Sequence, residues 1–429
     1  NTAVHRIYIS ERAKVRIGEL DSRIAVLKAR LDELPPNGEP ADGEPAKKIA
    51  SELATLTETR TSLLPMTKEV KVMVMDTLAK PRDTMILVKG IYDDATDRKA
   101  VAAVPNMLPP LQAVDGQRNT RLDLARWIVS ADNPLTARVT VNRYWQTFFG
   151  RGLVTTPDDF GLQGAQPTHP QLLDWLAVEF IESGWNVKQI HKLIVTSDTY
   201  RQSARVTPDL LQRDPANELL ARAPRYRMPS WMLRDQALAA SGLLSPSIGG
   251  PPVRPYQPAG IWAEATFGKK LYQTDTGEKL YRRSIYTFWR RIIGPTMFFD
   301  TARRQTCQVK RNLTNTPLHA LTTLNDVTYV EAARVLARRA ILKHESSRDR
   351  VDWAFRVLTA RAPNEAELSI LTKRVDSYRE LFGSEPEKAT QLLSIGETPR
   401  DESLDTSEHA AYTALFNMLM NLDEGLVKP

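Results

Sequence analysis

Apolar side chains recur at helical spacing in segment after segment of this 429-residue chain, and this pattern constrains the fold most strongly. Two such stripes, at residues 10–34 and 46–64, flank a stretch rich in Pro and Gly, so each stripe is expected to pack against the other. More helical patterns follow after residue 119. The sequence therefore predicts a mainly α-helical chain with a few short β-strands (α+β).

Residues that start and stop helices divide the later part of the chain. Pro134 opens one predicted helix and Gly150 ends it, while Thr168 is expected to cap the next, with Pro170 near its start. The predicted helices cover residues 122–129, 134–149, 170–183, 187–200, 229–242, 317–324, 326–343, 348–359, 364–382 and 407–422.

Alternation of polar and apolar residues, the pattern of a strand, is rare in this sequence. It predicts short strands at residues 71–75 and 84–89 and one longer strand at 279–289. Residues 93–111 are polar and then Pro-rich, which predicts an extended connector. The acidic stretch 394–406 is expected to be mobile.

The chain is long for a single domain, and its patterns change along its length. We expect an antiparallel coiled-coil helical hairpin at residues 1–70, followed by short strands and a Pro-rich connector at 71–118. A large helical domain is predicted at 119–429. The chain opens at Asn1 with no signal peptide in view, so we expect a processed or partial product.

Charge and cysteine content exclude several classes of protein. The 58 Lys and Arg and the 51 Asp and Glu give a net charge of +7, and the basic residues are dispersed, which does not favour nucleic acid as a partner. No apolar run has the length of a transmembrane segment. The single cysteine, Cys307, excludes an internal disulfide and a Cys-x-x-Cys-His haem motif, so no cofactor within this chain is predicted.

The loop at residues 155–170 is the strongest candidate site. Asp158 and Asp159 supply adjacent carboxylates, and His169 stands at the start of a predicted helix. Paired carboxylates suit Ca²⁺ binding through oxygen ligands or acid and base catalysis. The competing interpretation is that one of these aspartates caps a turn while Phe160 packs into the core.

Cys307 is the second candidate for a catalytic residue. Several cations flank it in sequence, and they would favour its thiolate if the fold brings them together. A lone cysteine is more often a small buried apolar group. His191 and His319 lack any metal-binding spacing and are better explained as structural histidines.

Several motifs in a fixed order carry a family resemblance. They read Val-Asn-Arg-Tyr-Trp from 141, Phe-Gly-Arg-Gly-Leu-Val from 149, Thr-Pro-Asp-Asp-Phe-Gly from 156, His-Pro-Gln-Leu-Leu-Asp-Trp-Leu-Ala from 169, Arg-Ser-Ile-Tyr from 283, Thr-Asn-Thr-Pro-Leu from 314 and Leu-Asn-Asp from 324. From about residue 71 to its end, the chain resembles the C-terminal, haem-free domain of planctomycete cytochrome C domain-containing proteins, a family catalogued mainly as domains of unknown function.

The resemblance implies an exported protein of the periplasm or cell surface. Members of that family commonly carry an upstream cytochrome-c-like haem module and a second helical domain, which this sequence lacks. Such a module, holding haem c, is the expected partner, and electron transfer by this chain alone is not implied. No catalytic residue is carried over. Polar and aromatic residues in or beside the motifs are the predicted binding residues: Asn142, Arg143, Trp145, Arg151, Asp174, Arg283, Asn315 and Asn325.

Three functions are consistent with these observations. The leading hypothesis is a non-haem domain of a cytochrome-c-linked redox or surface assembly that binds a partner protein or an extracellular carbohydrate. An alternative is a metal-dependent or hydrolytic enzyme acting on polysaccharide through the 155–170 loop. A third is a structural component of a surface layer, self-associating through its helical hairpin.

Overall fold

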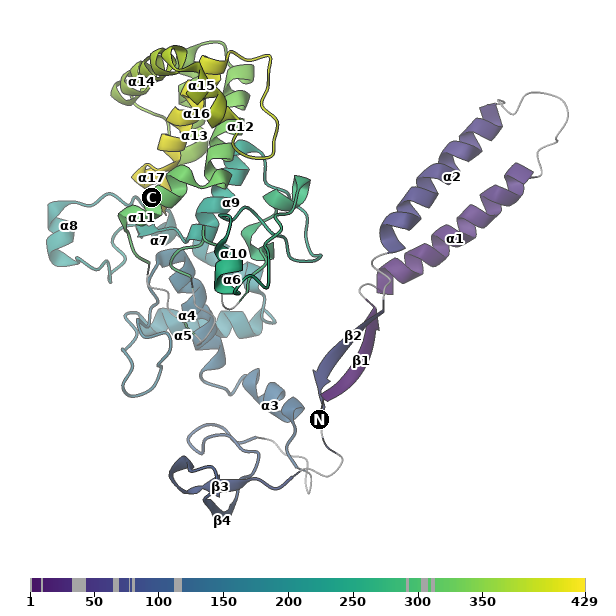
Figure 1. The fold of residues 1–429 in the computed structure, drawn as a ribbon. Coiled ribbons are helices and arrows are strands. Elements are labelled where there is room, and N and C mark those ends of the chain that lie inside the picture. The colour runs from purple at the N-terminus through teal and green to yellow at the C-terminus, as the bar shows by residue number, and fades with distance from the viewer. Residues whose placement is uncertain are drawn as a thin grey trace. The chain divides into compact units, whose positions relative to one another are not determined.

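The computed structural model describes residues 2–8, 11–32, 44–64, 69–76, 78, 82–111, 118–290, 293–301, 308–309 and 313–428. The chain divides into two compact units, Asn1–Ala103 and Val104–Pro429. Figure 1 shows the elements of each unit. The predicted class is confirmed, because the chain is mainly helical with a few short strands.

In the N-terminal unit, the chain runs from one strand through two helices to a second strand, and the two strands pair with each other. Strand β1 (Thr2–Tyr8) pairs antiparallel with β2 (Glu69–Met75), from Thr2 opposite Met75 to Tyr8 opposite Glu69. Helices α1 (Glu11–Asp32) and α2 (Glu44–Leu63) occupy the predicted helical segments. Strand β1 was not predicted from the sequence, because its partner β2 lies more than sixty residues away and such pairing leaves no local signal.

Helices α1 and α2 are held side by side by charged and apolar contacts (Figure 1). Arg23 pairs with Glu52 at 2.7 Å, and Arg60 pairs with Asp21. The later residue of α1 pairs with the earlier residue of α2, as in helices that run in opposite directions. Buried side chains on α1 recur every seven residues, at Ala13, Leu20 and Leu27.

A small hairpin completes this unit. Strand β3 (Met85–Leu87) pairs antiparallel with β4 (Ala95–Lys99), and a short 3₁₀ helix, η2 (Val88–Gly90), lies between them. The prediction that residues 93–111 form only a connector is therefore wrong over β4. The sequence of β4 is polar and almost wholly exposed, so it shows no alternation that would indicate a strand.

The first part of the C-terminal unit packs three helices around one core. The elements here are α3 (Arg121–Ile128), α4 (Thr136–Phe149), α5 (Pro170–Glu182), α6 (Val187–Thr196), α7 (Asp198–Arg201) and α8 (Pro208–Arg213). Val141 of α4, Leu176 of α5 and Ile190 of α6 are buried together in this core. Asn186 caps α6 by accepting the Gln189 N–H at 3.2 Å.

Helix α12 (Val327–Lys343) contributes many of the buried residues of the second core. Figure 1 shows this helix among the other helices of the C-terminal part. Ala332, Ala333, Ala337 and Ala340 have no exposed surface, and such small side chains let neighbouring helices approach closely. The surrounding elements are α9 (Ser230–Ser241), α11 (Pro317–Asn325), α13 (Ser347–Thr359), α14 (Glu365–Ser384), α15 (Pro386–Leu393), α16 (Thr406–Met420) and α17 (Asp423–Leu426). Strand β6 (Val427–Lys428) pairs antiparallel with β5 (Tyr226–Arg227), and α10 (Ile261–Ala265) is a single turn.

The predicted strand at residues 279–289 is wrong. Two 3₁₀ helices, η3 (Gly277–Tyr281) and η4 (Ser284–Tyr286), take its place. The buried Arg234 donates hydrogen bonds to the carbonyls of Leu280 and Arg282, at 2.7 and 2.9 Å. In a sheet, these carbonyls would accept N–H groups from a neighbouring strand, but here they accept from the Arg234 guanidinium.

The stretch 394–406, which the sequence predicts to be mobile, is bonded to α12 at several residues. The Thr398 N–H donates to the carboxylate of Glu331 at 2.7 Å, and Arg334 donates to the Thr398 carbonyl. Arg338 pairs with Asp401 at 3.0 Å. The polar composition of this stretch reflects charged partners on α12 that lie more than sixty residues away in sequence.

Candidate functional site

The end of α4 forms one wall of a cleft, and two glycines of the Phe-Gly-Arg-Gly motif make that wall possible. Gly150 ends the helix in a left-handed conformation, with φ of 73°. A Cβ atom at Gly150 would lie 2.8 Å from the ring of Tyr226. Glycine is therefore required both for the backbone conformation and for the close approach of Tyr226.

Asn142 fixes the segment that follows. Its side-chain amide donates to the Val154 carbonyl at 3.0 Å, and its side-chain oxygen accepts the Val154 N–H at 2.9 Å. A Cβ atom at Gly152 would lie 2.8 Å from this amide. Because Asn142 is fully buried, it is a positioning residue for the cleft wall.

The opposite wall is the loop at residues 214–222. The Asp214 carboxylate accepts the N–H groups of Glu218 and Leu219, both at 2.8 Å. Burial acts to raise the pKa of Asp214, but these N–H groups together with Arg222 and Arg151 hold that pKa below its ordinary value. Arg222 donates to the carbonyls of Asp214 and Pro215, both at 3.0 Å, which closes the loop into a fixed turn.

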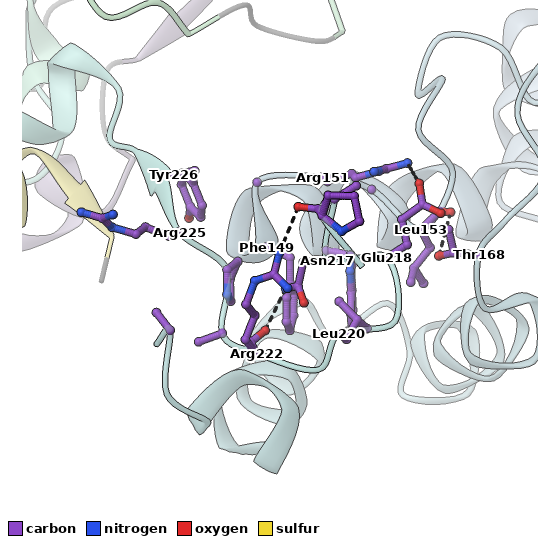
Figure 2. Close-up of a pocket in the computed structure, with 18 of the residues that line it drawn as sticks. Phe149, Arg151, Leu153, Thr168, Asn217, Glu218, Leu220, Arg222, Arg225 and Tyr226 are labelled. Atoms are coloured by element: carbon purple, nitrogen blue, oxygen red, sulfur yellow. Dashed lines mark hydrogen bonds and ion pairs between the residues drawn. The ribbon is translucent and has the colours of Figure 1, made fainter. Parts of the chain in front are cut away.

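The cleft between these walls has a volume of about 390 Å³. Arg151 from the α4 wall forms an ion pair with Glu218 from the opposite loop, as Figure 2 shows. Phe149 and Tyr226 supply aromatic lining. The remaining lining residues are Trp145, Gly150, Gly152, Leu153, Thr168, Ala204, Val206, Pro215, Ala216, Asn217, Leu220, Arg222, Ala223, Pro224 and Arg225.

Two residues of the loop adopt an uncommon backbone conformation. Asn217 and Leu220 have φ of 53° and 57°, and a left-handed Leu is a strained position. The side-chain oxygen of Asn217 is buried and has no partner among the described residues. Burial raises the pKa of Tyr226, which also lines the cleft, to about 12, and its hydroxyl donates to the Thr147 carbonyl at 2.7 Å.

These groups are suited to binding a polar ligand. Within the cleft, charged donors and acceptors already face one another, and aromatic rings supply apolar surface. The volume falls within the range of about 300–1,000 Å³ that is common for ligand sites. Among the described lining residues, the hydroxyl of Thr168 lies beside a potential base, because Nδ1 of His169 is 3.0 Å away.

The 155–170 loop, the strongest candidate from sequence, is built around a turn. The Asp159 carboxylate accepts the Gly161 N–H at 2.7 Å, and Phe160 packs against the first core. Asp158 is exposed. Among the described residues, no three or more His, Cys, Asp or Glu side chains come together as metal ligands. The catalytic and metal roles of Asp158 and Asp159 stay predictions.

The expectation that Thr168 caps α5 is wrong. His169 occupies the N-cap position without a side-chain cap, and its Nδ1 lies 3.0 Å from the Thr168 hydroxyl. Thr168 instead donates its N–H to the Leu153 carbonyl at 2.9 Å. This bond closes the loop across its base, which a short-range capping pattern cannot anticipate.

The other predicted binding residues fall into different places. Trp145 lines the cleft together with Arg151, whereas Arg143 is exposed on α4. Asp174 pairs with Arg138 at 2.6 Å, and the Asn325 side chain donates to the Leu321 carbonyl at 2.8 Å. Asn315 accepts from Arg227 at 2.8 Å, and Arg283 lies 4.0 Å from Asp235. Cys307 lies outside the described residues.

Sequence reasoning missed the second wall of the cleft. Asn217, Glu218, Arg222 and Tyr226 come from a segment that lacks periodicity and matches no known motif. The only local signal was the Asp-Pro-Ala-Asn run from 214, whose residue types are typical of a turn. The ion pair that joins the walls links residues 67 positions apart, so it could not be seen in the sequence.

The fold and the cleft define a class: a mainly helical domain with a ligand-sized polar cleft. A comparison with family models assigns the chain further. Residues 120–375 match the model described as "PSD1: Protein of unknown function (DUF1553)", so the chain belongs to this family. The matched region contains every residue that lines the cleft. Neither the curated proteins nor the solved structures contained a match. Within the described residues, no helix combines the length and apolar character needed to cross a membrane.

Proposed function

We propose that the C-terminal unit is a binding domain whose cleft takes a hydroxyl-rich ligand, a short segment of extracellular carbohydrate. The observation that carries this proposal is the ion pair of Arg151 and Glu218, which joins the two walls of an aromatic-lined cleft. A sugar hydroxyl donates and accepts hydrogen bonds at once, and a guanidinium beside a carboxylate offers both partners.

The charges of the cleft favour such a ligand over a simple anion. Arg151 and Arg225 have carboxylate partners, Glu218 and Asp423, and Arg222 is bonded to backbone carbonyls. An anion would have to compete with these partners for each guanidinium group. A saccharide gains hydrogen bonds from the remaining donors and acceptors without separating the pairs.

The test is isothermal titration calorimetry of the full chain with four neutral hexasaccharides. They are cellohexaose, xylohexaose, mannohexaose and laminarihexaose. Arg151→Gln should weaken binding at least about tenfold, as expected for loss of a charge-assisted hydrogen bond. Arg138→Gln is the matched control, because the Arg138–Asp174 pair has exposed fractions of 39% and 55% against 41% and 47% for Arg151–Glu218.

Two results would contradict the proposal. The first is that none of these saccharides binds to the full chain. The second is that the two variants weaken binding equally, since a general change in surface charge would then explain the loss. Specific loss in Arg151→Gln, with Arg138→Gln unchanged, is the supporting outcome.

We further propose the cellular setting that the family resemblance implies. In this setting the chain is exported and belongs to a cytochrome-c-linked redox or surface assembly, with haem c on a separate or upstream module. Purification from the native source should recover the chain with a haem-staining protein. Recovery without haem protein, from a cytosolic fraction, would contradict this setting.

We also propose that α1 and α2 form an antiparallel coiled coil that serves assembly. The support is the seven-residue spacing of the buried side chains on α1 and the two ion pairs between the helices. A partner protein, or a second copy within a surface assembly, would bind along this pair. Sedimentation of the full chain as a monomer, with or without the haem module, would contradict an assembly role.

A further inference from the structure

A second cluster of polar side chains surrounds Asp300, away from the cleft lining. His319 of α11 lies with Nε2 4.0 Å from the Asp300 carboxylate, and its ring stacks on Phe299 at 4.0 Å. Arg227 of β5 donates to the side-chain oxygen of Asn315 at 2.8 Å, and its guanidinium carbon lies 5.8 Å from the centre of the Phe299 ring. Three separate segments therefore contribute to one cluster.

The cluster contains buried polar atoms without partners. His319 is 8% exposed, and its Nδ1 has no hydrogen-bond partner among the described residues. The same holds for Nε of Arg227. Buried polar atoms nearly always have a partner, so these two atoms near one phenylalanine ring leave hydrogen-bonding capacity for a ligand.

A ligand that uses the free capacity of Arg227 has to accept a hydrogen bond. The Asp300 carboxylate already accepts the Thr314 N–H at 2.6 Å and the Thr314 hydroxyl at 2.9 Å. The unpaired Nε of Arg227 can only donate. Burial lowers the pKa of Arg227, and the nearby Asp300 offsets this only in part.

The cluster opens to solvent on one side. Thr314 and Asn315 are exposed, whereas His319 lies at the buried end. Asn315 directly precedes Thr316, the N-cap of α11, so the positive end of that helix is close by. Asp300 itself has a left-handed backbone with φ of 55°, which aspartate adopts more readily than most residues.

We propose that Arg227, Asn315 and His319 form a binding site for an oxyanion, the carboxylate or phosphate group of a small ligand. The site is distinct from the cleft because Tyr226 and Arg227 are successive residues of β5, and successive side chains of a strand point to opposite faces. Tyr226 lines the cleft and Arg227 faces the Asp300 cluster. The two sites lie back to back across this strand.

The test is an NMR titration of the full chain, with the histidine imidazoles labelled and inorganic phosphate or acetate as the probe. The imidazole signal of His319 should shift and saturate with at least one of the two anions. Saturation by phosphate alone assigns a phosphate-type ligand, and saturation by both assigns a general oxyanion site. No saturable shift with either anion would overturn the proposal.

Two variants and one control sharpen the result. Arg227→Gln should weaken binding at least about tenfold, the effect of losing one charge-assisted contact. Asn315→Asp keeps the acceptor for Arg227 at an exposed position, so the fold persists, yet its charge adds to that of the Asp300 carboxylate and should weaken binding at least about tenfold. Arg254→Gln is the control, because Arg254 lies over Phe288 at 5.3 Å in a similar arrangement elsewhere.

Affinities that are unchanged in Arg227→Gln and Asn315→Asp would overturn the assignment, as would an equal loss in Arg254→Gln. Thermal unfolding of each variant separates loss of binding from loss of fold, and Asn315→Asp remains informative if Arg227→Gln is unstable. Saccharide binding by the cleft uses other residues and other probes, so failure of either site leaves the other test intact.

Discussion

The hydroxyl of Tyr281 donates a hydrogen bond of 2.9 Å to the carboxylate of Glu331, which has no exposed surface. Tyr256 donates to the other oxygen of the same carboxylate at 3.0 Å, and the Thr398 N–H donates at 2.7 Å. One buried acid on α12 thereby joins the segments around residues 256, 281 and 398. The three donors and nearby Arg334 offset the cost of burying its charge.

Glu331→Gln should destabilise the protein strongly. The new amide nitrogen cannot accept from a tyrosine, so at least one buried donor loses its partner and Arg334 loses its counter-charge. We expect the free energy of unfolding to fall by about 3 kcal/mol in urea denaturation followed by circular dichroism. The exposed Glu380→Gln should stay within about 0.5 kcal/mol of the parent. Equal stability of the two variants would contradict the anchoring role of Glu331.

Gly396 lies against the side chain of the same Glu331. Its φ is 95°, and a Cβ atom there would lie 2.3 Å from the Glu331 side-chain carbon. Gly396→Ala should therefore cost at least about 2 kcal/mol, measured as a lower Tm. Gly383→Ala is the matched control, because Gly383 is helical with nothing within 4 Å of its added Cβ. That control should raise stability by up to about 1 kcal/mol, and a lower Tm for it would weaken the argument.

The role of Asn142 can be separated from simple stability. Asn142→Ala removes both side-chain bonds to Val154, so the Val154 amide should exchange its hydrogen faster by at least about tenfold. Asn186→Ala removes one cap bond to Gln189 and should destabilise α6 without this local effect. Hydrogen exchange with mass or NMR detection distinguishes the two. Equal acceleration at Val154 in both variants would mean that Asn142 acts only through global stability.

Helices were predictable where their signals are local. Asn364 caps α14 through a capping box with Glu367, and both residues lie within one turn of the predicted start. The Phe-Gly-Arg-Gly motif likewise indicated a helix end, because Gly150 has the left-handed φ that such an end requires. Both signals are set by neighbours in sequence, so they survive folding unchanged.

The parts that could not be predicted depend on distant partners. Arg234 looks like an ordinary polar residue of α9, but it is completely buried and bonds to carbonyls 46 and 48 residues away. The strand predicted around Ser284 was wrong although polar and apolar residues alternate there. The apolar Ile285 is exposed and its polar neighbour Ser284 is buried, which is the reverse of a half-buried strand. In the cleft, the partner of Arg151 was invisible for the same reason. Long-range partners of charged side chains decided each of these cases.

The Glu367 carboxylate makes the free energy of unfolding of the C-terminal unit fall as the pH becomes acidic. Its side-chain hydrogen bond with Arg361 and the Asn364 N–H hold its pKa at about 2, below the ordinary value of 4.5. A lowered folded-state pKa contributes stability that is present above pH 4.5 and is lost as the pH falls from 4.5 toward 2.

Glu367→Gln removes that titration. The parent should therefore be more stable than Glu367→Gln at pH 7, and the difference should shrink steadily between pH 4.5 and pH 2. The measurement is urea denaturation of both proteins across this range. The Asn364 cap bond to the backbone N–H of residue 367 is retained in the variant, so the helix start is not the cause of any difference. Because the side chain is 30% exposed, solvent screens the pair and the difference at pH 7 should be modest. A constant difference at all pH values would show that the Arg361 contact does not depend on the charge of Glu367.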